Sequence, residues 1–326
     1  MKFKKKLRIG IEVIKSKLFN KKIPLVVGWA ITNRCNYKCK YCGRWKKKEK
    51  ELSTQQVFSI IDELKQLGCK SVVFTGGEPL LREDIGLIVN YCKKNDLIVG
   101  INSNGSLFRK RINELKNIDS LTLSLDGPEK INDSLRVKGS YRNIVDAIKT
   151  AKSNKINVSL TTVVSGQNLE YLKNVLDTAK KYKIFVYFQP VSIVYNNKNI
   201  EEFKPFIEDY RKKIDELIDI KRKGNSYVGN SIPGLEHLRN WPNPKKIKCA
   251  FNIRLRIEPN GDIYTCGRVI EILEPQNFLK LGIREAFNRM TKLKCNYCWC
   301  AREVELNLAY SFKIKAIINI LKTILN

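Results

Sequence analysis

From Val26 to about residue 222, short apolar runs alternate with stretches of helical periodicity. This alternation is typical of βα units, whose parallel strands are covered by helices. The expected strands lie at 26–32, 71–75, 98–102, 120–125, 157–164 and 185–191. The expected helices lie at 53–68, 83–95, 107–117, 141–155, 168–182 and 201–222, and Ser53 and Gln56 fit a capping box. Right-handed crossovers between the strands would wrap this α/β unit into a partial (β/α)6 barrel.

The segments on either side of this unit have a different composition. Apolar residues at three- and four-residue spacing within 3–19, with Lys and Arg mostly on the other side, predict a basic amphipathic helix. The Gly-, Asn- and Pro-rich stretch that begins at 224 predicts a linker, and the Asn260-Gly261 turn predicts a β-hairpin. A last amphipathic helix is expected over 304–325. The expected segments are 1–23, 24–223, 224–248, 249–303 and 304–326.

The net charge of +29 limits the environments that suit the chain. It favours an anionic partner such as a membrane surface or nucleic acid, although a Lys-rich coding bias would raise the charge without any partner. No apolar run is long enough to span a bilayer, and charges interrupt the apolar residues near the N-terminus, unlike in a signal peptide. We therefore expect a cytoplasmic protein, with peripheral contact to the inner face of the cell membrane as an option.

The ten cysteines are unevenly placed, with three in an eight-residue segment and five after residue 248. This distribution favours metal ligation in a reducing compartment over a disulfide framework. Cys35, Cys39 and Cys42 follow the first expected strand with CxxxCxxC spacing. Three thiolates on one loop can hold three irons of a [4Fe-4S] cubane and leave the fourth iron open. Zinc is the alternative, but it usually takes four protein ligands, and no further Cys or His is adjacent.

Polar motifs end the next three expected strands. They are Gly76-Gly77-Glu78-Pro79, Asn102-Ser103-Asn104-Gly105 and Ser124-Leu125-Asp126-Gly127. Gln189-Pro190 ends the sixth strand. Because α/β barrels assemble their sites at the carboxyl ends of the strands, these motifs and the cysteine loop are expected on one rim.

The cysteine loop, with Tyr41 before its last cysteine, and the motifs that follow over residues 24–195 resemble the radical S-adenosylmethionine (SAM) superfamily. The resemblance implies a partial TIM-like barrel and a [4Fe-4S] cluster on Cys35, Cys39 and Cys42 that binds SAM at its open iron. It also implies a reduced electron donor such as ferredoxin or flavodoxin. The implied reaction cleaves SAM reductively, and the resulting 5′-deoxyadenosyl radical abstracts hydrogen from an unactivated carbon.

In this family, residues at the strand ends face SAM. The matching residues here are Gly76, Gly77, Glu78, Asn102, Ser124, Asp126 and Arg136. By the resemblance, Glu78 would accept from the SAM amino group, and Arg136 would pair with the SAM carboxylate unless it is a surface arginine. Ser124 would contact the SAM carboxylate or ribose, and Asp126 the ribose or the substrate. Gln189 is a further candidate for SAM or substrate.

The C-terminal cysteines resemble the SPASM extension in its shortened twitch form. The implied ligands of an auxiliary [4Fe-4S] cluster are Cys249, Cys266, Cys295 and Cys298. Cys300 could replace Cys298, and a zinc ribbon is the alternative site. Cys69 and Cys92 are expected to be buried structural thiols, and the single histidine, His237, is expected to have no role in the chemistry.

The substrate is open at this stage. The two amphipathic ends of a basic chain favour a membrane lipid or isoprenoid chain, joined carbon to carbon, at an anionic surface. If both helices instead pack against the barrel, this argument loses its basis. Crosslinking or modification of a ribosomally made peptide or protein is the first alternative. RNA modification is the second, although no RNA-binding motif is present, so a nucleic-acid partner is not expected; a non-catalytic zinc module is the third.

Overall fold

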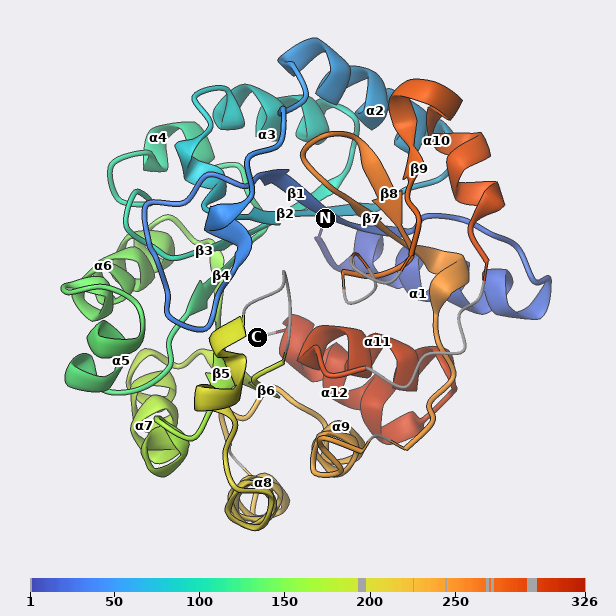
Figure 1. Ribbon diagram of the computed structural model, residues 1–326. Helices are drawn as coiled ribbons and strands as arrows, with labels where there is room; N and C mark the ends of the chain where they lie inside the picture. Colours follow the sequence, from blue (N-terminus) through green and yellow to red (C-terminus); the bar gives the residue numbers. More distant parts are fainter. Residues whose placement is uncertain are drawn as a thin grey trace.

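The computed structural model describes residues 2–192, 198–224, 226–243, 245–267, 270, 273–291 and 298–325. Six parallel strands curve into an open partial barrel with helices on the outside (Figure 1). The strands are β1 (Val26–Thr32), β2 (Ser71–Gly76), β3 (Ile98–Ser103), β4 (Ser120–Ser124), β5 (Asn157–Val164) and β6 (Phe185–Pro190). The helices are α2 (Thr54–Gln66), α3 (Ile85–Lys94), α4 (Ile112–Leu115), α5 (Glu129–Leu135), α6 (Ser140–Ser153), α7 (Leu172–Tyr182) and α8 (Ile207–Arg222).

The local predictions for this unit hold with few exceptions. All six expected strands are present, and the capping box that begins α2 is confirmed because Ser53 and Gln56 bond each other's backbone N–H. The helix predicted over 107–117 is a single turn, α4, and α5 was not predicted. The N-terminal helix is also present as α1 (Lys2–Leu18).

The C-terminal hairpin extends the barrel sheet. Strand β7 (Arg254–Ile257) pairs in parallel with β1, and β8 (Asp262–Tyr264) and β9 (Gln276–Asn277) continue the sheet in antiparallel pairing. The strand order is β6-β5-β4-β3-β2-β1-β7-β8-β9. The hairpin predicted at Asn260-Gly261 is therefore present, with Gly261 at a φ of +87°. The boundaries of the five expected segments stay predictions. The structure shows that the hairpin belongs to the same sheet as the barrel strands.

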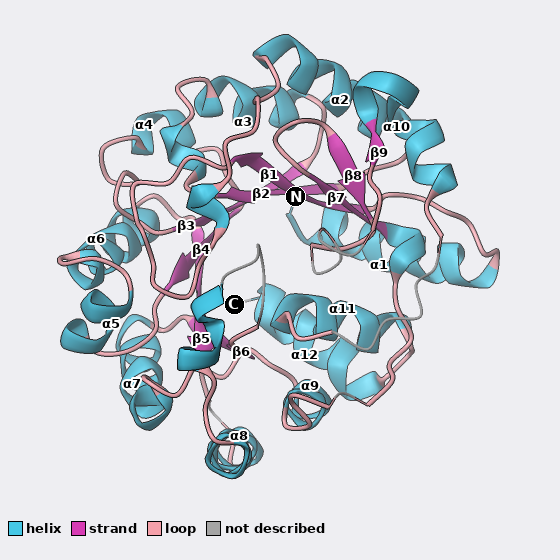
Figure 2. Ribbon diagram, in the orientation of Figure 1, coloured by secondary structure: helices cyan, strands magenta, loops and turns pink. Residues whose placement is uncertain are grey.

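Two predictions about the C-terminal part need correction. The expected linker contains helix α9 (Ile232–Leu238), which Ser231 caps by accepting from the Gly234 N–H. The single helix expected over 304–325 is two helices, α11 (Ala301–Tyr310) and α12 (Ile314–Leu325), because the chain turns at Phe312 with a φ of +58°. Helix α10 (Phe278–Arg289) was not predicted. Helices α11 and α12 lie on the open side of the barrel, where α11 contacts β6 and both contact α9 (Figure 2).

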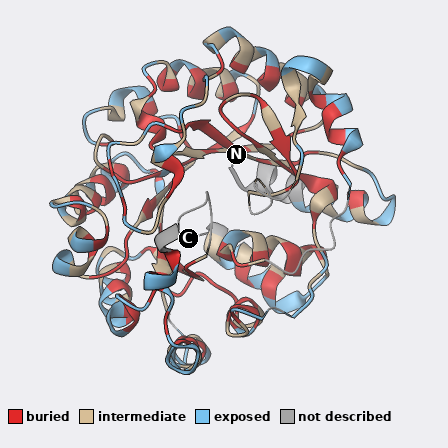
Figure 3. Cartoon of the chain, in the orientation of Figure 1, coloured by how far each residue is buried: buried red, intermediate tan, exposed pale blue. Residues whose placement is uncertain are grey.

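The two faces of the barrel strands differ in side-chain size. Their outward-facing residues, such as Val27, Trp29 and Phe74, are fully buried under the helices, and buried positions follow the strands and the inner helix faces (Figure 3). Many inward-facing residues are small or polar, including Ser120 and Ser159. In closed barrels, large branched side chains fill the interior. Here small and polar side chains take some of these positions, and a cavity remains inside the barrel. No helix among the described residues has the length and apolar character needed to cross a bilayer.

A buried ion pair ties the cysteine loop to the C-terminal hairpin. Arg44, two residues after Cys42, donates from Nη1 and Nη2 to the Glu258 carboxylate at 2.9 and 3.2 Å, and both side chains are 4% exposed. Burial opposes ionisation of Glu258, but the charges of Arg256 and Arg44 outweigh it and lower its pKa. The contribution of this carboxylate to stability is therefore complete above the ordinary glutamate pKa and declines as the pH falls below that value.

Replacing Glu258 tests this tie. We expect Glu258→Gln to lower the free energy of unfolding by about 3–5 kcal/mol, because it leaves a buried arginine without its counter-charge. Denaturant unfolding of the metal-free protein under anaerobic conditions measures the change. The control is Asp215→Asn, which breaks the more exposed Arg239–Asp215 pair and should cost less than about 1 kcal/mol. Equal losses in the two variants would contradict the assignment.

Candidate functional site

The loop after β1 brings the three N-terminal cysteines to the carboxyl end of the barrel strands. The Tyr37 N–H lies 3.4 Å from the Cys35 sulfur, and the Cys42 N–H donates to the Cys39 carbonyl at 3.0 Å. Cys39 is buried, and Cys35 and Cys42 are half-buried. Burial raises the pKa of Cys35 to about 12 and that of Cys39 to about 11, so both thiols would have to lose a proton in order to serve as metal ligands.

The two glycines of the Gly-Gly-Glu-Pro turn allow the turn to lie against the cysteine loop. The Gly77 N–H donates to the Thr32 carbonyl at 2.8 Å, and the Glu78 N–H donates to the Arg34 carbonyl at 2.8 Å. A Cβ on Gly76, whose φ is +137°, would lie 2.1 Å from the Thr32 carbonyl oxygen, and one on Gly77 would lie 2.1 Å from that of Arg34. The close approach that requires glycine here is therefore to the backbone at the end of β1 and at the start of the cysteine loop. The predicted contact of Gly76 and Gly77 with SAM stays a prediction.

Glu78 joins the ends of β2 and β3 beneath this turn. Its carboxylate is fully buried and accepts from Leu80 N–H at 3.1 Å, Ser103 Oγ at 2.9 Å and Asn104 N–H at 2.7 Å. Burial raises the pKa of Glu78 to about 7. Its predicted contact with the SAM amino group stays a prediction, and the structure adds a role in holding two strand ends together.

Asp126 and Arg136 pair with each other next to Cys39. Arg136 Nε and Nη2 each lie 2.8 Å from Asp126 Oδ2, and the Tyr41 hydroxyl donates to the same oxygen at 2.5 Å. Arg136 Nη1 lies 3.8 Å from the Cys39 sulfur. Burial opposes the charge of Arg136, but Asp126 raises its pKa. The alternative of a surface arginine is wrong, because the Arg136 side chain is 7% exposed. Asp126 has no exposed surface and orients Arg136 and Tyr41; its contact with ribose or substrate stays a prediction.

The other predicted rim residues have more open surroundings. Ser124 is half-buried at the end of β4, and Asn102 is exposed toward the inside of the barrel. Gln189 accepts from the Ala301 N–H at 3.1 Å and so contacts the first residue of α11. The roles of Asn102, Ser124 and Gln189 toward SAM or substrate stay predictions.

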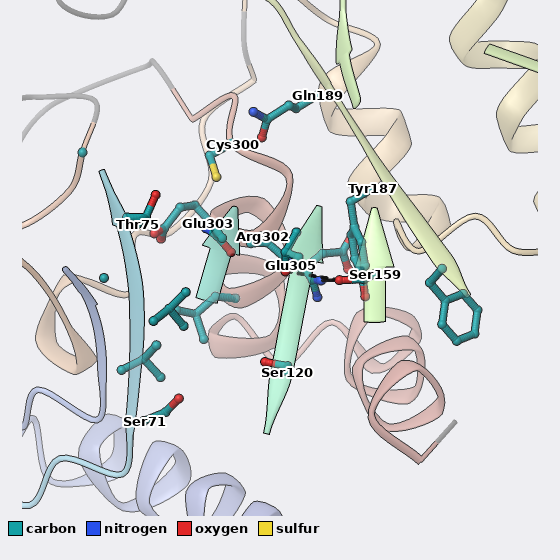
Figure 4. A pocket seen from close by; sticks show the side chains of 18 of the residues that line it. Ser71, Thr75, Ser120, Ser159, Tyr187, Gln189, Cys300, Arg302, Glu303 and Glu305 are labelled. Atoms are coloured by element: carbon teal, nitrogen blue, oxygen red, sulfur yellow. Dashed lines mark hydrogen bonds between the residues drawn. The ribbon is translucent and has the colours of Figure 1, made fainter. Parts of the chain in front are cut away.

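A cavity of about 980 Å³ runs along the inside of the barrel. It is lined at the start of the strands by Val26, Ser71, Ile98, Ser120 and Asn157, and at their carboxyl ends by Cys42, Gly76, Gln189 and Pro190. Inside it, the Arg302 guanidinium lies over the Tyr187 ring at 3.5 Å and donates to Ser159 Oγ at 2.8 Å (Figure 4). No role was predicted for these three residues from the sequence. Small polar residues at alternate positions of a strand, such as Asn157 and Ser159, could have indicated that Ser159 faces a cavity.

The C-terminal cysteines surround a buried arginine. Arg254 Nη2 lies 3.1 Å from the Cys249 sulfur. Burial opposes the charge of Arg254, but the nearby sulfurs of Cys266, Cys249, Cys298 and Cys300 raise its pKa. Asn307 donates to the Cys298 sulfur at 3.0 Å, whereas Cys266 and Cys300 line the barrel cavity. Cys295 lies outside the described residues.

The remaining cysteines and the histidine take structural positions. Cys69 and Cys92 are fully buried in the core, as predicted. His237 is buried beside the Trp299 ring, and its Nε2 lies 3.0 Å from the Cys298 carbonyl. Burial lowers the pKa of His237. It therefore supports the segment that carries Cys298.

Comparison with known proteins identifies the family. The model of the radical SAM superfamily matches residues 29–179. A GTP 3',8-cyclase of Limosilactobacillus fermentum is 32% identical over 73% of this chain and 77% of its own length. The chain belongs to the radical SAM superfamily. A Fe-coproporphyrin III synthase of Methanosarcina barkeri is 29% identical over 63% of this radical SAM chain, which spans 53% of that enzyme.

Other similar proteins include a maturase and two enzymes whose structures contain a bound peptide. The mycofactocin maturase MftC of Mycolicibacterium smegmatis is 28% identical over 74% of this chain, which spans 64% of the maturase. The structure of Streptococcus suis SuiB bound to precursor peptide SuiA has a TM-score of 0.67 at 20% identity, covering 84% of this chain and 66% of that one. The structure of anSMEcpe with AdoMet and a peptide has a TM-score of 0.66 at 17% identity, covering 91% and 99%. At these identities the two structures show a shared fold.

The residues at the rim suit the cofactors of the family. Radical SAM enzymes use a [4Fe-4S] cluster and SAM, and Cys35, Cys39 and Cys42 supply three thiols from one loop beside the Gly-Gly-Glu-Pro turn. Among the described residues, no three Cys, His, Asp or Glu side chains converge as the ligands of a single metal ion do. The thiolates of a cubane bind different irons, so a cluster does not require such convergence.

Substitution of Gly77 tests the packing of the turn against the cysteine loop. In Gly77→Ala the new methyl group would meet the Arg34 carbonyl, so the turn or the loop must move. We expect SAM binding to the anaerobically reconstituted enzyme to weaken by about tenfold or more, equivalent to about 1.4 kcal/mol, and the iron content to fall. Equilibrium dialysis and iron analysis measure both. The control, Gly10→Ala, places a methyl group in open space, and equal behaviour of the two variants would contradict the assignment.

Proposed function

We propose that this radical SAM enzyme modifies a ribosomally made peptide or protein by hydrogen abstraction from an unactivated carbon. In this proposal Cys35, Cys39 and Cys42 hold the SAM-binding [4Fe-4S] cluster. Cys249, Cys266, Cys295 and Cys298 hold an auxiliary [4Fe-4S] cluster, with Cys300 as the alternative to Cys298. A reduced ferredoxin or flavodoxin would supply the electron.

The observation that carries the proposal is the course of the cavity. It is lined by Cys42 on the side of the first cysteine group and by Cys266 and Cys300 on the side of the second. A substrate held there would lie between both groups. The volume of the cavity is at the upper end of the range for small-molecule pockets, which suits an extended segment of a peptide substrate. The similarity to a maturase and to the fold of two peptide-bound enzymes supports the same substrate class.

The protein contributes positioning in this scheme. The cluster and SAM, when bound, supply reductive cleavage of the sulfonium and the 5′-deoxyadenosyl radical. Asp126 holds Arg136 and Tyr41 beside Cys39, and Glu78 fixes the ends of β2 and β3. The C-terminal helix α11 lies on the open side of the barrel and presents Arg302 to the cavity. Closure of this side would limit access of water to the reacting groups.

The substrate class is tested by offering three kinds of substrate to the reduced, reconstituted enzyme with SAM. The probes are synthetic peptides for short reading frames next to its gene, GTP, and a total lipid extract. We expect 5′-deoxyadenosine release together with a peptide that loses two hydrogens in mass spectrometry. A Cys39→Ala variant is the control and should release no nucleoside. Conversion of GTP or lipid alone, or nucleoside release with no change in any peptide, would overturn the peptide proposal.

We also propose that the two amphipathic helices dock the enzyme on an anionic membrane surface. Large apolar side chains are exposed along α1, along α12 and in the turns next to them. They are Ile11, Ile14, Leu18, Phe19, Phe312, Ile314, Ile318 and Leu321. The two regions adjoin, because Lys17 Nζ lies 3.4 Å from the centre of the Phe312 ring. Helix α1 buries one side through Val13, and α12 buries one side through Ala316. The two helices therefore pack against the rest of the protein on one side and expose apolar residues on the other.

Charge favours an anionic surface as the occupant of this apolar face. Lysines accompany it on both helices, and the net charge of the chain is +29. Docking on a membrane would favour a lipid or isoprenoid substrate over a peptide. The names of the relatives described above do not refer to lipids. Apolar insertion and headgroup attraction together are the usual basis of peripheral binding.

Co-sedimentation with vesicles tests the docking face. We expect stronger binding to vesicles with anionic lipid than to zwitterionic vesicles, with a decrease at high salt. The double variant Ile314→Asp, Ile318→Asp should bind about tenfold or more weakly, because it loses two apolar insertions. The control is Phe206→Asp, which places the same charge at another large apolar side chain, 84% exposed, just before α8. Absence of binding, or equal binding by both variants, would contradict the proposal.

A further inference from the structure

A charged side chain lies beside the sulfurs of the C-terminal cysteine group. Arg254 is the first residue of β7, and its side chain is 6% exposed. Four cysteines from three chain segments, Cys249, Cys266, Cys298 and Cys300, interact with its charge. Burying a guanidinium is costly unless it is paired and its N–H groups are satisfied. The contacts of Arg254 therefore indicate what this group is arranged to bind.

One edge of this guanidinium points toward sulfur. In this chain Arg82 and Arg239 each bind a carboxylate with the same two atoms, Nε and Nη2. The N–H groups on these two atoms are parallel and form a two-donor edge. In Arg254, Nη2 lies 3.1 Å from the Cys249 sulfur. The Nε–H group of Arg254 therefore lies on the same edge as the nitrogen that reaches this sulfur.

The second donor on that edge is unpaired. Among the described residues, Arg254 Nε is buried without a hydrogen-bond partner. A buried donor that is left unpaired costs about 1–3 kcal/mol, and more when the group is charged. A cluster bound by these cysteines would place inorganic sulfide and thiolate sulfur next to this edge, and both are acceptors.

The opposite edge is held by a carboxylate. Arg254 Nη1 pairs with Glu303, which follows Cys300 by three residues at the start of α11. The Glu303 side chain is 32% exposed and contacts the barrel cavity. This pair fixes the orientation of the guanidinium and also offsets part of its charge.

We propose that Arg254 donates two hydrogen bonds, from Nε and Nη2, to sulfur atoms of the auxiliary cluster and thereby raises its reduction potential. The inference rests on the proposed auxiliary cluster. A four-thiolate [4Fe-4S] cluster is anionic and gains one more negative charge on reduction, so hydrogen bonds and a nearby cation stabilise the reduced form more than the oxidised form. Glu303 acts in the opposite sense, because its negative charge opposes reduction.

The test uses the full chain with Cys35, Cys39 and Cys42 replaced by Ala, so that only the auxiliary cluster can form. After anaerobic reconstitution, a redox titration followed by paramagnetic resonance gives its midpoint potential. We expect Arg254→Met to shift the midpoint to a more negative value and Glu303→Gln to shift it to a more positive one. Arg254→Lys keeps the charge without the two-donor edge. Its midpoint potential should lie between that of Arg254→Met and that of the parent. Arg239→Met, which removes an arginine with the same two-donor contact from the C-cap of α9, should leave the midpoint unchanged.

The outcomes separate the inference from the proposed function. If the chain with three alanines binds no iron and sulfide, the auxiliary cluster itself is wrong. If it binds one cluster but Arg254→Met and Glu303→Gln leave the midpoint unchanged, or shift it in the same direction, the role of Arg254 is wrong and the cluster stands. If Arg254→Met does not retain a cluster, Arg254→Lys and Glu303→Gln test the role of Arg254. They should shift the midpoint potential in opposite directions, to a more negative and a more positive value, and shifts in the same direction would contradict that role.

Discussion

The site depends on the contact between two stretches of backbone at the rim of the barrel. The turn after β2 lies against the chain that leads from β1 into the cysteine loop, with Gly76 and Gly77 too close to carbonyl oxygens for any side chain. The hydrogen bonds from Gly77 and Glu78 to that chain fix the entry to the loop. The Glu78 carboxylate then connects this turn to the end of β3. The position of Cys35 is thus set by neighbouring strands as well as by its own loop.

Buried arginines also help to fix the positions of both cysteine groups. Arg136 holds a carboxylate with one edge and faces the Cys39 sulfur with its other nitrogen. Arg254 faces the Cys249 sulfur with one edge and holds a carboxylate with its other nitrogen. Arg44 pairs with the Glu258 carboxylate and the Asn33 amide oxygen, and it connects the first cysteine loop to the hairpin that precedes Cys266. Each pair is costly to break, because the remaining partner would be a buried, uncompensated charge.

Sequence patterns predicted the local features well and the long-range pairing poorly. The strands and the capping box at Ser53 depend on neighbouring residues, and the pattern of apolar positions is enough to locate them. The parallel pairing of β7 with β1 joins segments about 230 residues apart, and no local signal encodes it. The break at Phe312 interrupts an apolar pattern that continues on both sides, so periodicity alone predicts one helix. The partners of Asp126 were missed because Arg136 and Tyr41 meet it only in the folded barrel.

The open barrel explains why the C-terminal segment matters for the cavity. Six strands cannot close a barrel that eight strands close in the full fold, and one side must be covered by other elements. Helix α11 covers it, and Gln189 at the end of β6 accepts from the first N–H of this helix. The same helix carries Arg302 into the cavity and Glu303 to Arg254. Because it directly follows Cys300, any movement of α11 would change the cavity wall and the surroundings of the C-terminal cysteines together.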